Sequence, residues 1–183
     1  MIRLLLLLLL LPALLLVTVS GMVDLGAAEL RPLPVPGTSL IIGVPDEWTA
    51  VLPADGTVIR LRRPAGEAGL AISVTALPPG DGPAAFTQRS LAELQKLLFQ
   101  FDLLDWEFTE LRGTRTWSRL HFRFIHGETR WEEELWLTVD QTTGTNQAVA
   151  VAFSATPATW AAWKPIFDRC LNETAASRPV LTR

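Results

Sequence analysis

The chain of 183 residues contains a single cysteine, Cys170, and a lone cysteine cannot form a disulfide within its own chain. Lysine is nearly as scarce, since only two of the sixteen basic residues are lysine, and no long basic run occurs. The formal net charge is −3. A mildly acidic chain without a basic tract argues against nucleic acid as a partner. We therefore expect a domain that is stabilised by its core and does not bind nucleic acid.

Motifs for covalent, phosphate or metal chemistry are also missing. Ser39 lacks the glycine spacing of a nucleophile elbow, and neither lysine follows a glycine-rich phosphate loop. Cys170 falls on the apolar stripe of a predicted helix, where a buried structural thiol is expected. His121 and His126 are five residues apart and point to opposite faces of a strand, unless His126 leaves the strand in the turn. We expect no catalytic residue, no metal site and no cofactor.

The N-terminus, in contrast, is strongly apolar. One basic residue precedes an uncharged run over residues 4–23, and small residues follow at positions 26–28. This layout is typical of a secretory signal peptide that ends near residue 28, although the run is also long enough for a membrane anchor. No cysteine lies near this segment to carry a lipid. Both interpretations place the domain outside the cytoplasm, in the periplasm or secreted. Contact with a membrane is expected only through this segment, if it is uncleaved.

Proline content and periodicity divide the rest of the chain. Residues 29–37 contain RPLPVP, which predicts an extended tether that need not join the core. Residues 38–175 form the predicted domain, and residues 176–183 form a C-terminal tail. We expect one domain, because a chain of this length can bury one sizeable core.

The apolar pattern of this domain runs from strands to a helix, then to further strands and a second helix. The first helix is predicted over residues 83–100, with Leu91, Leu98 and Phe101 on its apolar stripe. The second is predicted to begin at Thr156 as N-cap and to contain Pro165. Short hairpin connections between the strands predict an antiparallel sheet. The fold class is therefore α+β, a single antiparallel sheet flanked by helices.

The stretch RWEEELWLTVD, which ends at Asp140, places three consecutive glutamates between two tryptophans. Side chains alternate along a strand, so Glu132 and Glu134 share one face and Glu133 lies on the other. The three carboxylates therefore cannot act as one cluster. Because the other side chains on its face are apolar, Glu133 either reaches water at a sheet edge or is buried facing a cavity.

The preceding strand supplies basic residues opposite these acids. A two-residue hairpin loop would set Arg119 opposite Glu134 and His121 opposite Glu132. A four-residue loop would instead set Arg123 opposite Glu132. Either register predicts an exposed ladder of ion pairs, each of which contributes about 0.2–1 kcal/mol. This interpretation is favoured over general acid–base catalysis, which requires perturbed carboxylates in a cleft.

Trp117 and Trp136 share the polar face of this hairpin, and the sequence leaves two interpretations open. Either a helix covers both tryptophans, which then belong to the core, or they form an exposed patch rimmed by charge. A patch of that composition is typical of partner-binding surfaces. Its candidate residues are Trp117, Trp136, Arg119, His121, Glu132 and Glu134.

Three stretches of the domain carry a resemblance to a known family. They are GVPDEWTAV near the start, FDLLDWEFTELRG after the first helix, and AVAVAFSATPATWAAWKPIFDRCLNE at the end. The combination resembles the PsbP-like superfamily, which includes the DcrB-like bacterial proteins. The resemblance implies a central antiparallel sheet between helices, as an α/β/α sandwich, and a mostly non-enzymatic role in assembly or partner binding. We expect a non-catalytic binding or assembly module whose partner is another envelope protein. The alternative is a small-molecule carrier or hydrolase with a pocket near Glu133.

Overall fold

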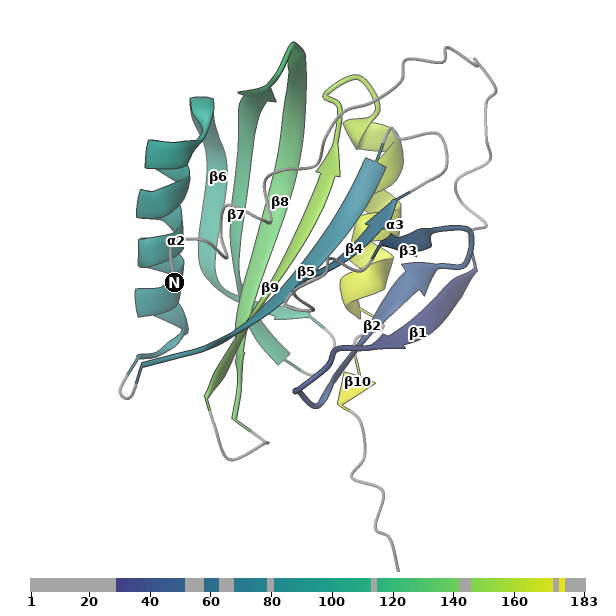
Figure 1. Ribbon diagram of the computed structural model, residues 1–183, viewed down its shortest axis with the longest axis vertical. Coiled ribbons are helices and arrows are strands. Elements are labelled where there is room, and N and C mark those ends of the chain that lie inside the picture. Colours follow the sequence, from purple (N-terminus) through teal and green to yellow (C-terminus); the bar gives the residue numbers. More distant parts are fainter. Residues whose placement is uncertain are drawn as a thin grey trace, which may run out of the picture.

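The computed structural model describes residues 29–51, 58–62, 68–78, 81–112, 115–141, 146–172 and 175–176. Within them the chain forms a large and a small antiparallel sheet together with two helices (Figure 1). The predicted signal peptide or membrane anchor and nearly all of the predicted C-terminal tail lie outside the described residues. Neither helix in the described part of the chain is long and apolar enough to cross a membrane.

The large sheet has seven strands in the order β3-β4-β5-β9-β8-β7-β6. Its strands are β3 (Thr49–Val51), β4 (Val58–Arg62), β5 (Ala68–Ala76), β6 (Phe99–Arg112), β7 (Arg115–His126), β8 (Thr129–Asp140) and β9 (Gln147–Ala155). The small sheet has the order β1-β2-β10, formed by β1 (Leu30–Pro34), β2 (Leu40–Pro45) and β10 (Ala175–Ala176). The helices are α2 (Pro83–Leu97) and α3 (Trp160–Asn172).

The two helices cover opposite faces of the large sheet (Figure 1). Phe86 and Leu94 of α2 pack against one face, and Trp163 and other residues of α3 pack against the opposite face together with β1 and β2. Because side chains alternate along a strand, β8 contributes Leu135 to the first core and Trp136 to the second. The predicted α+β sandwich is confirmed, whereas the separate small sheet was not anticipated.

The proline-rich segment is extended, as expected, and it joins the fold, which the sequence did not require. β1 pairs with β2 along its whole length, Arg31 donates a hydrogen bond of 3.1 Å to the carbonyl of Trp48, and Val35 is buried. Proline is compatible with β1 because this strand lies at the edge of the small sheet, where a missing backbone N–H interrupts no ladder.

Both helices are shorter than predicted. α2 ends before Phe101, which lies on β6 instead of on the helix. α3 begins at Trp160, after a turn in which the carbonyl of Thr156 accepts the N–H of Trp160 at 2.9 Å. Pro165 lies inside α3, as predicted. These differences arise because apolar periodicity continues through a turn and does not mark where the helix ends.

The β7–β8 hairpin turns at Gly127, whose φ of +62° lies in the region that favours glycine. The loop has two residues, because His126 still pairs with Thr129. Arg123 nevertheless lies opposite Glu132, which is the register predicted for the longer loop. Both strands simply extend one residue further into the turn than the sequence suggested.

Candidate functional site

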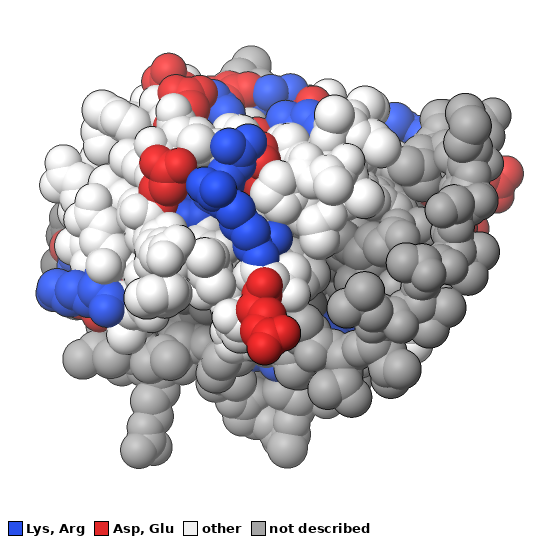
Figure 2. Space-filling model, turned by 90° about the horizontal axis from the view of Figure 1, so that it is seen from above, with Lys and Arg blue, Asp and Glu red and all other residues white. Residues whose placement is uncertain are grey.

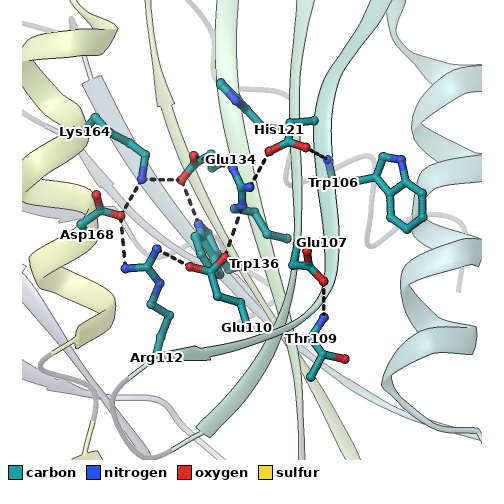
Figure 3. Close-up of polar contacts among 12 residues, drawn as sticks. Trp106, Glu107, Thr109, Glu110, Arg112, His121, Glu134, Trp136, Lys164 and Asp168 are labelled. Carbon is teal, nitrogen blue, oxygen red and sulfur yellow. Dashed lines mark hydrogen bonds and ion pairs between the residues drawn. The ribbon is translucent and has the colours of Figure 1, made fainter.

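A network of ion pairs and hydrogen bonds lies on the α3 side of the large sheet (Figure 3). Its centre is the carboxylate of Glu134, which is 1% exposed. This carboxylate accepts the indole N–H of Trp136 at 3.1 Å, and it lies 3.3 Å from the ammonium of Lys164 on α3. Arg119 of β7 approaches the same carboxylate at 3.5 Å. The buried acid therefore has a donor from the sheet and a cation from the helix.

The network continues from Glu134 to the outer strand β6. Arg119 lies 3.4 Å from Glu110 and 2.5 Å from Asp105, both on β6. The hydrogen bond from Arg119 lowers the pKa of the Asp105 carboxyl. The remaining members join β6 to α3 and are Arg112, Lys164 and Asp168. The ion pairs of this network thus link α3 and β6 to the strands β7 and β8 of the large sheet.

A second part of the network surrounds Glu132, which is also buried. Arg123 donates from Nε to Glu132 at 2.7 Å, and Nε2 of His121 lies 2.9 Å from the same carboxylate. The ring of His121 stacks on Trp160, at 5.2 Å between centroids and 20° between planes. Acids do lie beside bases, as predicted, but the prediction that this ladder is exposed was wrong. Trp160 at the start of α3 packs on His121, and both glutamates are buried. Buried pairs respond far more strongly to loss of a partner than exposed pairs do.

Trp117 and Trp136 are both fully buried and belong to the core that α3 covers. The covering-helix interpretation is therefore confirmed, and the exposed-patch interpretation was wrong. The structure brings Arg119 close to Glu134 and His121 close to Glu132, but it does not present them as an accessible surface. Among the described residues, no group of three or more His, Cys, Asp or Glu side chains is arranged to hold a metal.

Glu133 lies on the opposite face of β8, in the core beneath α2, and is 1% exposed. β8 is an inner strand, so the expectation that Glu133 reaches water at a sheet edge was wrong. Its Oε2 accepts a hydrogen bond of 2.6 Å from Ser154, whereas its Oε1 is buried with no hydrogen-bond partner among the described residues. Desolvation raises the pKa of Glu133 to about 7, although the hydrogen bond from Ser154 opposes this shift.

An exposed apolar surface of the described residues was not predicted from the sequence. The exposed large apolar side chains of the described residues all lie between the end of α2 and the middle of β6. We call them the apolar edge, and they are Leu97 (37% exposed), Phe99 (67%), Leu104 (38%) and Trp106 (49%). The stretch FQFDLLDWEF carries a signal for this surface, because its apolar residues occur on both faces of the strand. A single buried face cannot accommodate all of them.

An irregular backbone turns the side chain of Phe99 outward. Gln100 has a φ of +52°, and the pairing of β6 with β7 shifts register between Phe99 and Asp102. In a regular strand Phe99 and Phe101 would share a face. Instead Phe99 is exposed, while Phe101 packs on Phe122 with 5.1 Å between ring centroids. Bulges re-aim side chains in this way and occur often at functional edges.

We expect the strain at Gln100 to be measurable. Replacing Gln100 by glycine should raise the free energy of unfolding by about 0.5–1 kcal/mol, because a left-handed conformation costs a side chain more than it costs glycine. Replacing it by valine should lower that free energy by about 1–2 kcal/mol, because a branched Cβ fits this conformation worst. Urea unfolding of both variants followed by circular dichroism measures the difference. Equal effects of the two substitutions would contradict the strained conformation.

The backbone of β6 is not a free template for another strand, although β6 lies at the edge of the sheet. Asp105 accepts the backbone N–H of Trp106 at 2.8 Å, and Glu107 accepts that of Thr109 at 3.4 Å (Figure 3). Its pairing with β7 also shifts register at three places. Charges and bulges of this kind discourage edge-to-edge pairing. Contacts at this edge would therefore be made by side chains.

Charges of both signs occur together on the end of the molecule that lies uppermost in Figure 1. Figure 2 looks down on this end and shows basic and acidic side chains next to one another among uncharged ones. Phosphate backbones are bound by continuous basic surfaces. The visible face therefore does not have the charge distribution of a nucleic-acid interface.

Comparison with solved structures finds the same fold in proteins of low sequence identity. LpqN of Mycobacterium tuberculosis, described as involved in cell envelope biogenesis, is 16% identical with a TM-score of 0.62, over 83% of this chain and 92% of LpqN. PA94 of Pseudomonas aeruginosa, a protein of unknown function, is 15% identical with a TM-score of 0.56, over 83% and 99% of the two chains. The Ran-binding protein Mog1p of Saccharomyces cerevisiae is 7% identical with a TM-score of 0.55, over 82% and 97%.

No family model matches the chain, and no curated protein matches it by sequence. Identities of 7–16% establish a shared fold and nothing finer. The described residues thus have the α+β fold of LpqN, PA94 and Mog1p.

Proposed function

We propose that this protein is a non-catalytic, extracytoplasmic binding module of the PsbP-like, DcrB-like type, which contacts another protein through its apolar edge. The observation that carries the proposal is the concentration of exposed apolar side chains between Leu97 and Trp106. Exposed aromatic groups gathered on one element are typical of interaction surfaces. The envelope role stated for LpqN and the Ran binding stated for Mog1p support a binding function for this fold.

The partner that we infer is another envelope protein with an apolar contact surface and a basic rim. Phe99 and Trp106 would be its anchors, because large aromatic side chains supply most of the binding energy of such interfaces. Asp102 lies between these two side chains in the chain and Glu107 directly follows Trp106, and both acids are exposed, which favours basic residues at the edge of the contact. Strand addition is disfavoured because carboxylates already occupy backbone N–H groups of β6.

The proposal can be tested by site-specific photo-crosslinking in the native host. A crosslinking residue at Phe99 should capture one envelope protein, whereas the same residue at Gln88, exposed on α2, should not. The captured protein would then be purified and titrated by calorimetry. We expect Phe99→Ala to weaken its binding at least tenfold, which corresponds to about 1.4 kcal/mol, and Gln88→Ala to leave its binding unchanged.

Stability provides the control for this experiment. Because Phe99 is 67% exposed, Phe99→Ala should change the free energy of unfolding by no more than about 0.5 kcal/mol. Equal crosslinking from Gln88, or a dissociation constant that Phe99→Ala does not change, would contradict the apolar edge as the contact surface. Crosslinking to a second copy of this chain would show that the apolar edge mediates self-association and does not bind another envelope protein.

A further inference from the structure

Among the described residues, Glu133 is the charged side chain enclosed in the core between α2 and the large sheet. β7 turns Leu120, Phe122 and Phe124 toward this core, and β9 contributes Ser154. The buried residues of α2 are Phe86, Thr87, Ser90 and Leu94. None of these neighbours is charged, so no opposite charge in this core compensates an ionised Glu133.

The charged residues of α2 are engaged at its surface. Arg89 forms an ion pair of 2.6 Å with Asp81, and Lys96 pairs with Glu93 at 3.4 Å. These groups lie outside the buried face of the helix. They therefore do not supply a counter-charge to Glu133.

The hydrogen bonds around Glu133 leave an ionised carboxylate incompletely satisfied. Ser154 donates to Oε2, but Oε1 is buried with no hydrogen-bond partner among the described residues. The hydroxyl of Ser90, on the buried face of α2, is likewise without one. An ionised carboxylate accepts hydrogen bonds at both oxygens, and here only one oxygen has a donor. An ionised Glu133 would thus be buried and incompletely hydrogen-bonded, which is strongly unfavourable.

α2 is the layer that can move to admit water. β8 is hydrogen-bonded to β7 and β9 on both sides along its length. α2 is held on the sheet by side-chain packing, and its N-cap residue, Gly82, makes no side-chain capping bond. Separation of α2 from the sheet therefore costs fewer backbone hydrogen bonds than separation of any inner strand.

We propose that Glu133 makes the attachment of α2 pH-dependent, so that ionisation of its carboxyl promotes local opening of this helix as the pH rises toward neutral. The inference is independent of the proposed binding function, because it concerns the equilibrium between a closed and an open helix. It assigns to Glu133 the role of a pH-sensitive element within the fold.

The direction follows from proton binding in the two states. Burial raises the pKa of Glu133 in the closed state from 4.5 to about 7. The closed state therefore holds one more proton than the open state between these two pH values. The contribution of Glu133 to closure is fully present below pH 4.5 and is lost as the pH rises through about 7. The opening constant should increase roughly tenfold per pH unit within this window and level off above it.

Hydrogen exchange of the full chain, followed by mass spectrometry and corrected for the intrinsic rate, tests this inference. We expect the opening constant of α2 to rise by about 100-fold between pH 5 and pH 8 in the unmodified protein. In Glu133→Gln, which has no titrating group at this position, the constant should not change over this range. Glu133→Met, similar in volume and apolar, serves the same purpose if the glutamine variant does not fold.

Two results would overturn the proposal. One is an equal pH dependence of α2 exchange in the protein and in both variants. The other is a loss of protection that occurs equally in α2 and in the inner strands β8 and β9, because this would show global destabilisation instead of helix opening. A pH-dependent loss that is confined to α2 and abolished in the variants supports it.

Discussion

Replacing Trp136 by alanine is expected to lower the free energy of unfolding by about 3–5 kcal/mol. The side chain is fully buried, and Arg112 and Arg119 lie over its ring at 5.2 and 5.9 Å from the centroid. Its indole N–H also donates to the buried carboxylate of Glu134. Truncation therefore leaves a cavity beneath α3 and removes a donor from a buried acid, and each change is unfavourable. Urea unfolding monitored by circular dichroism measures the loss.

Trp106 provides a matched control, because the same substitution removes an indole that is half exposed. It packs on Phe108 at 4.5 Å between centroids and points to the α2 side of β6 (Figure 3). Trp106→Ala should cost about 1 kcal/mol or less, since most of the large losses arise in cores. Similar losses for Trp106→Ala and Trp136→Ala would contradict the burial of Trp136 and the exposure of Trp106.

Replacing Asp140 by alanine is expected to lower the free energy of unfolding by about 3–5 kcal/mol, the effect of breaking a buried ion pair. Asp140, at the end of β8, is fully buried and accepts the backbone N–H of Ser39 at 2.5 Å and its hydroxyl at 3.0 Å. Arg115 lies 3.5 Å from the same carboxylate and is only 14% exposed. The substitution removes this link between the small and large sheets. It also removes the Asp140 carboxylate that Arg115 contacts. Thermal and urea unfolding both measure this effect.

Asp168 is the control for Asp140, because it is an ion-paired aspartate near the surface. Its side chain is 31% exposed and lies 2.5 Å from Lys164. Asp168→Ala should cost no more than about 1 kcal/mol, since exposed pairs contribute little. An Asp140→Ala variant that is as stable as Asp168→Ala would show that the contact between the two sheets does not depend on this carboxylate.

Much of the hairpin could be predicted from the sequence, because alternation along a strand is a local property of the backbone. It placed Glu132 and Glu134 on one face and Glu133 on the other, and the structure has this arrangement. The sequence left two registers of the hairpin open, because the exact residues of the turn depend on how far the strands extend. The apolar edge was not predicted, although apolar residues on both faces of FQFDLLDWEF indicate an exposed surface, since the outward turn of Phe99 depends on the irregular backbone around Gln100.

The sequence by itself determined that strands and helices of these kinds form, and which side chains share a face. Only the tertiary structure decided which face is covered and by what. α3 buries Trp136 and the acids beside it, and the inner position of β8 in the sheet removes Glu133 from water. The physical reason is that alternation follows from the geometry of neighbouring residues, whereas strand order and helix placement follow from contacts between residues far apart in the chain.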